Sequence, residues 1–151
     1  MNLKHSVFGP PQVLSGKIAD CMATRKSGYV QPISDNFASL NSIIYQPNDP
    51  LIGIQVTNAA THPIKTKGLK ALQSLLQNDL SHLRPTSTNP WIILFVVPTS
   101  MEKSFTRQNT TGDASTTWSK KTVQYVLGLD EHEVFKFHAQ FEDEQDESEN
   151  E

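Results

Sequence analysis

Basic and imidazole side chains gather around the start of one segment with helical spacing. His62 and Lys65 precede this segment closely, and Lys67 and Lys70 fall in its first two turns. Backbone N–H groups at a helix N-terminus favour anions, so cations at this place are suited to binding phosphate. In the alternative interpretation, His62 helps to cap the turn and Lys65 is a solvated surface cation. Both interpretations stay open on the residues alone.

Other kinds of chemistry have less support in the sequence. Cys21 is the only cysteine, which excludes an internal disulfide and a cysteine-based zinc cluster. His132 and His138 do not have the helical spacing of a paired histidine metal site. No Gly-x-Ser-x-Gly pattern is present, so acyl transfer by a serine nucleophile is not indicated.

The net charge of −3 conceals two regions of opposite sign. Residues 142–151 contain seven carboxylates and no cation, whereas residues 1–141 contain 13 cations and 9 carboxylates, a balance of about +4. A block of like charges cannot bury enough apolar surface to fold, so we expect residues 139–151 to form a disordered acidic tail. This tail either keeps the chain solvated or competes with phosphates for the basic body.

Length and hydropathy limit the location and the organisation of the chain. The 151 residues suffice for one domain with a core. No stretch approaches the roughly 20 apolar residues that span a bilayer, so no membrane association is expected. Residues 1–15 lack the apolar centre of a secretory signal peptide, which predicts an intracellular protein, nuclear or cytoplasmic.

Five short apolar segments predict strands. They cover residues 28–32, 40–45, 51–57, 91–97 and 122–127. The turn-forming residues 46–50 predict an antiparallel hairpin between the second and third strands. In the third strand, the period of two places Gln55 and Thr57 on one face, with Gly53 beside them. The run 91–97 has no alternation and predicts a strand buried on both faces.

A leucine stripe predicts the main helix over residues 66–83. Its leucines recur at steps of three and four, Pro63 fits a first helical turn, and Pro85 ends the segment. A strand, a helix and a strand in this order predict a parallel pair. Residues 100–119 are expected to form a surface loop, and residues 134–137 fit either a helix or a strand. The predicted order is β-β-β-α-β-β.

Six segments form a distinctive pattern when they are taken together: 28–32 (GYVQP), 40–45 (LNSIIY), 53–57 (GIQVT), 61–69 (THPIKTKGL), 94–98 (LFVVP) and 124–127 (QYVL). Together they resemble the C-terminal nuclease-like module of the Crinkler and retrotransposon-hot-spot proteins, in the PD-(D/E)XK superfamily. The resemblance covers about residues 28 to 129. It implies an α/β domain over residues 28–138, with a restriction-endonuclease-like mixed β-sheet flanked by helices, after an N-terminal loop or helical segment at residues 1–27.

The resemblance also implies where a nuclease site would lie and how this chain departs from it. In active members, an Asp on one strand and a Glu-x-Lys on the next surround a Mg²⁺ ion that polarises phosphate and activates water. The corresponding positions here are Asn41, Gln55 and Thr57. Both carboxylates and the lysine are missing, although Lys65 or Lys67 could reach in from the start of the helix. We therefore expect no metal cofactor; if an ion binds at all, Asn41 and Gln55 are its ligands.

These departures lead to three hypotheses. The first is a catalytically inactive nuclease-fold module, from a decayed or truncated family member, that binds nucleic acid or a protein partner. Nucleic acid would then contact His62, Lys65, Lys67 and Lys70. The second is a working Mg²⁺-dependent nuclease with a rearranged site of Asn41, Gln55 and Lys65. The third is an effector-like scaffold for protein interactions, which would act in a host nucleus.

Overall fold

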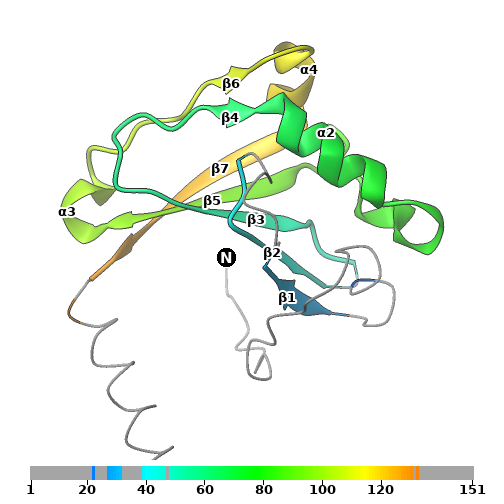
Figure 1. Ribbon diagram of the computed structural model, residues 1–151, viewed down its shortest axis with the longest axis horizontal. Helices are drawn as coiled ribbons and strands as arrows, with labels where there is room; N and C mark the ends of the chain where they lie inside the picture. Colours follow the sequence, from blue (N-terminus) through cyan, green and yellow to red (C-terminus); the bar gives the residue numbers. More distant parts are fainter. Residues whose placement is uncertain (1–21, 23–26, 32–38, 47, 131, 133–151) are drawn as a thin grey trace, which may run out of the picture.

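The five segments predicted as strands pair into one mixed sheet. The computed structural model describes residues 22, 27–31, 39–46, 48–130 and 132. The strands are β1 (Gly28–Val30), β2 (Ser42–Tyr45), β3 (Ile52–Val56), β5 (Trp91–Pro98) and β7 (Thr122–Leu129), in the spatial order β1-β2-β3-β5-β7 (Figure 1). The β1–β2 and β2–β3 pairs are antiparallel, and the β3–β5 and β5–β7 pairs are parallel. The prediction of an α/β fold with a mixed sheet is confirmed.

A tight turn sets the register of the β2–β3 hairpin. Asn48 has a φ of 67°, in the left-handed region that asparagine tolerates better than most residues. The N–H of Asp49 donates to the carbonyl of Gln46 at 3.4 Å. The resulting register places Ile43 opposite Gly53, so the predicted hairpin is confirmed.

The crossover from β3 to β5 contains a shorter helix than the leucine stripe predicted. It consists of β4 (Ile64–Lys65), α2 (Thr66–Leu75) and the 3₁₀ helix η1 (Asn78–Leu83). The prediction of one helix over residues 66–83 is wrong at its C-terminal half, because the backbone leaves the helical conformation at Leu76 (ψ 75°) and is extended at Gln77 (ψ 167°), before η1 begins at Asn78. Pro63 was also misplaced, since it precedes β4 and lies outside the helix.

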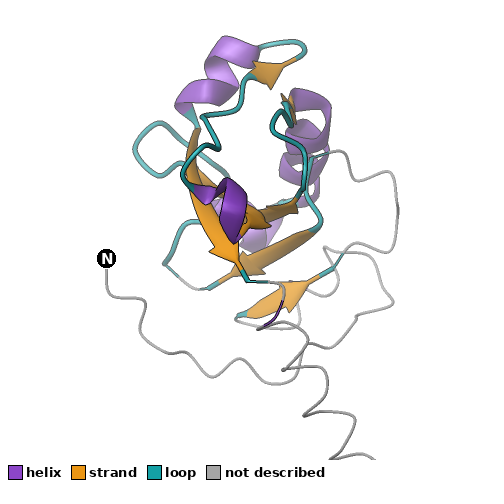
Figure 2. Ribbon diagram, turned by 90° about the vertical axis from the view of Figure 1, so that its left-hand side faces the viewer, coloured by secondary structure: helices purple, strands orange, loops and turns teal. Residues whose placement is uncertain are grey.

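Helix α2 covers one face of the sheet. Leu69 and Leu72 are buried, as is Leu76 just after the helix. They share one core cluster with the alternate residues of β5, namely Trp91, Ile93, Phe95 and Val97. Figure 2 shows the described helices gathered on this side of the sheet. Each large apolar side chain fully buried here contributes about 1.5–3 kcal/mol relative to an exposed one.

The opposite face of the sheet has little cover. We call it the outer face and define it by the alternate residues Ile54, Val56, Leu94, Val96, Val123, Tyr125, Leu127 and Leu129, which the strand registers place side by side. On β5 the residues of this face are only half-buried, so the expectation of a strand buried on both faces is wrong. On β7 they are exposed.

Residues 99–121 form short elements, where the sequence predicted a surface loop. They are α3 (Thr99–Glu102), β6 (Thr110–Thr111) and α4 (Ser115–Lys120). Strand β6 pairs in parallel with β4, in a separate two-stranded sheet. Trp118 of α4 is buried and packs against Trp91, with ring centroids 5.7 Å apart. This buried tryptophan anchors the segment to the core.

Several sequence predictions fall outside the described residues. These are the N-terminal segment 1–27, apart from Met22 and Ser27, the undecided segment 134–137, and the acidic tail 139–151. Met22 is helical and buried in the main core cluster. Within the described part of the chain, no helix combines the length and the hydropathy needed to cross a membrane.

Candidate functional site

Asn41 and Gln55 lie beside each other at one end of the β2–β3 hairpin. The N–H of Asn41 donates to the carbonyl of Ile54 at 2.7 Å, and the Oδ1 of Asn41 accepts from the N–H of Val56 at 2.7 Å. These two bonds bracket Gln55, which is 7 % exposed and whose Nε2 donates to the carbonyl of Val56 at 3.1 Å. The side-chain oxygen of Asn41 thus extends the β2–β3 hydrogen bonding by one residue, just before β2 begins at Ser42.

Thr57 follows on the same strand, and its hydroxyl is also engaged. Its N–H donates to the carbonyl of Val96 at 3.0 Å, which extends the β3–β5 pairing by one residue. Its Oγ1 accepts from the N–H of Ala59 at 3.1 Å and so closes the turn that leaves the sheet. Thr57 therefore makes a local structural contact and provides no cationic group.

A serine links the start of α2 to the same end of the hairpin. The N–H of Lys65 donates to the Oγ of Ser39 at 2.7 Å, and that hydroxyl is 3.4 Å from the carbonyl of Lys65. Ser39 has a left-handed φ of 89° and lies two residues before Asn41. The structure thus brings the backbone of Lys65 close to the chain that enters β2, while Lys65 itself is an exposed residue.

A buried glutamine holds the loop that carries His62. The N–H of His62 donates to the Oε1 of Gln108 at 2.6 Å, and the Nε2 of Gln108 donates to the carbonyls of Thr106 and Ala60 at 2.8 and 3.3 Å. Gln124 of β7 uses its side-chain amide to accept from the Gln108 N–H at 2.8 Å and to donate to the Gln108 carbonyl at 2.9 Å. Nothing in the sequence singled out this pair, because neutral amides lack a charge pattern or a characteristic spacing.

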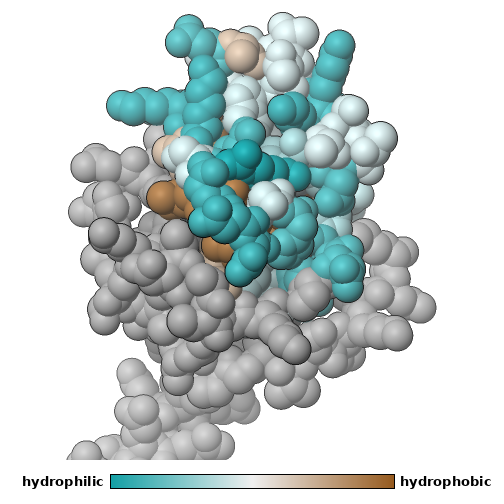
Figure 3. Space-filling view, turned by 90° about the vertical axis from the view of Figure 1, so that its right-hand side faces the viewer, coloured by the Kyte–Doolittle hydropathy of each residue, from teal (hydrophilic) through white to brown (hydrophobic). Residues whose placement is uncertain are grey.

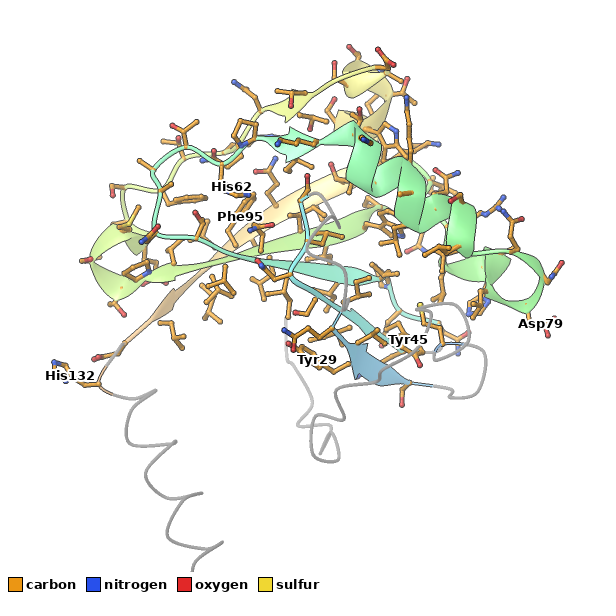
Figure 4. All side chains as sticks on the ribbon, in the orientation of Figure 1. Tyr29, Tyr45, His62, Asp79, Phe95 and His132 are labelled. Carbon is orange, nitrogen blue, oxygen red and sulfur yellow. The ribbon has the colours of Figure 1, made fainter. Side chains whose placement is uncertain are left out.

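His62 is half-buried and lies over the core face of the sheet. Its ring meets the ring of Phe95 edge-on, at a centroid distance of 6.5 Å (Figure 4). The prediction placed His62 at the start of the helix, whereas α2 begins four residues later, at Thr66. His62 therefore does not share the helix N-terminus with Lys65 and Lys67.

The exposed side of α2 carries cations and no carboxylate. Lys67 and Lys70 are exposed, and all ten residues of α2 lack an acidic group. Lys70 also lines a surface pocket of about 270 Å³ together with Gln73, Ser74 and Arg84. Figure 3, which views the molecule from the right-hand side of Figure 1, shows a largely hydrophilic surface at this end.

Arg84 is a cation of this pocket that the sequence did not single out. Its Nε donates to the carbonyl of Leu76 at 2.6 Å, and that carbonyl follows the last turn of α2. This bond fixes the plane of the guanidinium, and the terminal nitrogens keep further N–H donors for an anion. The pocket therefore combines an anchored cation, Arg84, and an exposed cation, Lys70, with no carboxylate in its lining.

The side chains of Asn41 and Gln55, the ligands expected from the sequence for any bound ion, do not fit a Mg²⁺ ion. Mg²⁺ in proteins is held by carboxylates at short, nearly octahedral distances. Asn41 and Gln55 are neutral, and the Asn41 oxygen already accepts a backbone hydrogen bond. Over the described ranges, no group of three or more His, Cys, Asp or Glu side chains is placed to hold a metal ion.

Comparisons of the chain with models of protein families, with curated proteins and with solved structures gave no match.

Proposed function

We propose that the chain is a catalytically inactive nuclease-fold module, similar to the C-terminal module of the Crinkler and retrotransposon-hot-spot proteins, that binds nucleic acid along the exposed side of α2. The observation that carries the proposal is that Asn41 and Gln55 are uncharged and that their polar atoms already make hydrogen bonds. Asn41 and Gln55 bond to backbone groups of β3, and the resemblance assigns the metal ligands of active members to these two positions. A hairpin that leads into a parallel pair through a helical crossover supports the restriction-endonuclease-like assignment.

The charge distribution supports nucleic acid as the ligand. Lys67 and Lys70 lie in the first half of α2, and Arg84 and Lys70 share one pocket. Neither α2 nor the lining of this pocket contains a carboxylate that would repel a polyanion. Phosphate contacts of this kind position a nucleic acid without reading its sequence, so the expected binding has little sequence preference.

The binding half of the proposal is tested by the salt dependence of affinity. We expect a fluorescently labelled duplex DNA to bind the full chain with an affinity that falls steeply as salt rises. The double substitution Lys67→Gln and Lys70→Gln should weaken binding and reduce the slope of log K against log salt by roughly 1.8, about 0.9 for each lost phosphate contact.

The matched control removes the same charge at the other end of the molecule. Lys103 and Arg107 are exposed and lie at and after the end of α3. The substitutions Lys103→Gln and Arg107→Gln together should leave the slope near the wild-type value. No salt-sensitive binding to DNA or RNA, or an equal effect of both double substitutions, would show that the α2 surface is not a nucleic-acid site.

The catalytic half is tested with Mg²⁺ and Mn²⁺. We expect neither ion to support cleavage of plasmid or single-stranded substrates above the background of a preparation with Gln55→Ala. Cleavage by the wild-type chain that is lost in Gln55→Ala would instead favour the rearranged nuclease of Asn41, Gln55 and Lys65.

A further inference from the structure

The pocket at the end of α2 holds hydrogen-bond donors that no described residue uses. Its volume is about 270 Å³, and it is lined by Lys70, Gln73, Ser74 and Arg84. The Nε of Arg84 donates to the carbonyl of Leu76. The terminal N–H groups of Arg84, the ammonium group of Lys70 and the side-chain amide of Gln73 donate to no other described residue.

The carbonyl groups at the end of α2 do not need these donors. The carbonyls of residues 73–75 accept, in chain order, from the N–H of Leu76, the Nε2 of Gln77 and the N–H of Gln77, at 3.2, 2.8 and 3.0 Å. The next carbonyl, of Leu76, is the one that Arg84 occupies. A cation at this position also opposes the partial negative charge of a helix C-terminus. No described residue therefore supplies an acceptor for the remaining donors.

The charge of the pocket requires an anion. Lys70 and Arg84 are both cationic, and neither forms an ion pair with a described carboxylate. Asp79, the acidic residue in the first turn of η1, lies at the outer tip of the turn beyond α2 and does not line the pocket (Figure 4). Like charges that share a site repel each other, so a bound anion would stabilise the pair.

A phosphate monoester matches these groups in charge and in shape. It has three acceptor oxygens and a charge of about −1.5 to −2 at neutral pH, whereas an internal phosphate of a nucleic acid carries a single charge. The planar fork of Arg84 can pair with two of these oxygens, which leaves the third for Lys70 or Gln73. The pocket volume equals that of roughly nine water molecules at about 30 Å³ each, so a phosphate and part of its ester group fit.

We propose that this pocket binds the phosphate group of a monoester, carried either by the end of a nucleic acid strand or by a small phosphorylated molecule. The strand-end source rests on the proposed function, to which it adds a preference for phosphorylated ends. The phosphate site itself does not depend on that function. Lys67 lies on the same helix outside the lining, so substitutions can separate the pocket from the rest of the cationic surface.

Inorganic phosphate tests the pocket alone. In a nuclear magnetic resonance titration of the isotope-labelled full chain, phosphate should shift the amide signals of Lys70, Gln73 and Arg84 more than that of Lys103. Lys70→Gln should weaken this binding about tenfold, which corresponds to one lost hydrogen bond to a charged group. Lys67→Gln should have a much smaller effect, because solvent screens an exposed charge outside the pocket. The absence of shifts at the pocket, or an equal loss in both variants, would overturn the proposal.

Oligonucleotides identify the source of the phosphate. A short single-stranded DNA with an internal fluorescent label is prepared with a phosphate at the 5′ end, at the 3′ end or at neither end. We expect at least one phosphorylated form to bind the full chain about tenfold more tightly than the form without a terminal phosphate. Lys70→Gln should abolish this difference. Lys67→Gln should weaken all three forms similarly and preserve the difference.

A carboxylate placed in the pocket gives a test that retains both cations. Gln73→Glu keeps the size of the side chain and should abolish the binding of inorganic phosphate through charge repulsion. Gln77→Glu adds the same charge four residues later, outside the lining, and should leave most of the binding intact. Circular dichroism melting curves verify that both variants fold. Equal effects of the two substitutions would contradict a site in this pocket.

The results distinguish the pocket from the proposed function. Phosphate binding that depends on Lys70, in a chain that binds no oligonucleotide, would support the pocket, assign it to a small phosphorylated molecule and contradict the nucleic-acid proposal. Oligonucleotide binding that depends on Lys67 and Lys70 but not on a terminal phosphate, without binding of inorganic phosphate, would contradict the pocket proposal alone. Phosphate shifts that persist in both Lys70→Gln and Gln73→Glu would show a general surface effect and would also overturn it.

Discussion

Replacing Gln108 with leucine should destabilise the fold more than any other loss of a single neutral side-chain amide among the described residues. Gln108 is 5 % exposed and joins three backbone positions of two separate loops, at His62, Ala60 and Thr106. Leucine has a similar volume, so the change removes the hydrogen bonds without opening a large cavity.

The magnitude follows from what each partner loses. The N–H of His62 belongs to a half-buried residue and loses a 2.6 Å bond, and an unpaired buried donor costs about 1–3 kcal/mol. The carbonyls of Ala60 and Thr106 belong to exposed residues, so water can replace the amide, and each loss is near the lower end of about 0.5–1.5 kcal/mol. We expect a total decrease of about 2–4 kcal/mol in the free energy of unfolding.

Urea denaturation measures this decrease. With a slope of about 2 kcal/mol/M, the middle of the range for a small domain, the midpoint should fall by about 1–2 M. Gln77→Leu is the matched control: Gln77 is exposed, its Nε2 donates only to the nearby Ser74 carbonyl, and the expected change is within about 0.5 kcal/mol. Equal midpoints for Gln108→Leu and wild type would refute the idea that this amide holds the His62 loop.

Three further substitutions probe other parts of the fold. Gly112→Ala should cost about 1–3 kcal/mol in urea denaturation, because φ is 101° and the new Cβ would lie 2.5 Å from the Oγ1 of Thr66; an unchanged midpoint would contradict that geometry. Asn41→Leu loses the bond to the Val56 N–H and should lower the free energy of unfolding by about 1 kcal/mol at this exposed site, and with it the melting temperature. Asn41→Asp retains the acceptor and serves as the control; equal melting temperatures for the two variants would show that this bond contributes nothing. Trp91→Phe removes a buried 2.7 Å hydrogen bond from the indole to a backbone carbonyl and should cost about 1–3 kcal/mol by calorimetry, with wild-type stability as the contrary result.

Strands and the hairpin could be predicted because their signals are local. The alternation in residues 51–57 correctly placed Gly53 and Gln55 on one face of the third strand, and the structure shows that both are buried. The turn residues 46–50 fixed the antiparallel pairing, and the strand–helix–strand order predicted the parallel β3–β5 pair. These features follow from backbone sterics and burial, which a single sequence carries.

The end of the main helix could not be predicted from its leucines. Leu76 and Leu83 are buried, like the leucines of α2, because the 3₁₀ turn continues along the same core and keeps a similar spacing. The break lies at Leu76 and the extended Gln77, and the left-handed Asn78 follows it; these backbone changes have no effect on the hydrophobic pattern. An asparagine flanked by Gln77 and Asp79 is the available signal, since asparagine adopts this conformation more readily than most residues.

The candidate site was predicted in part. Asn41 and Gln55 are indeed neighbours, yet their use as hydrogen-bonding partners of the β3 backbone became visible only in three dimensions. Arg84 enters the pocket with Lys70 because the chain turns back after α2, which brings together residues fourteen positions apart. Contacts of this kind depend on the tertiary fold and have no local pattern.

The packing of Trp118 on Trp91 has a practical consequence for spectroscopy. The protein has two tryptophans, and both lie in the corner formed by α4 and the start of β5. Their emission therefore reports the surroundings of that corner alone, while the β1–β2 pair at the other edge of the sheet contributes no indole signal. Coincident unfolding curves by tryptophan emission and far-ultraviolet circular dichroism would show that both edges of the sheet melt as one cooperative unit.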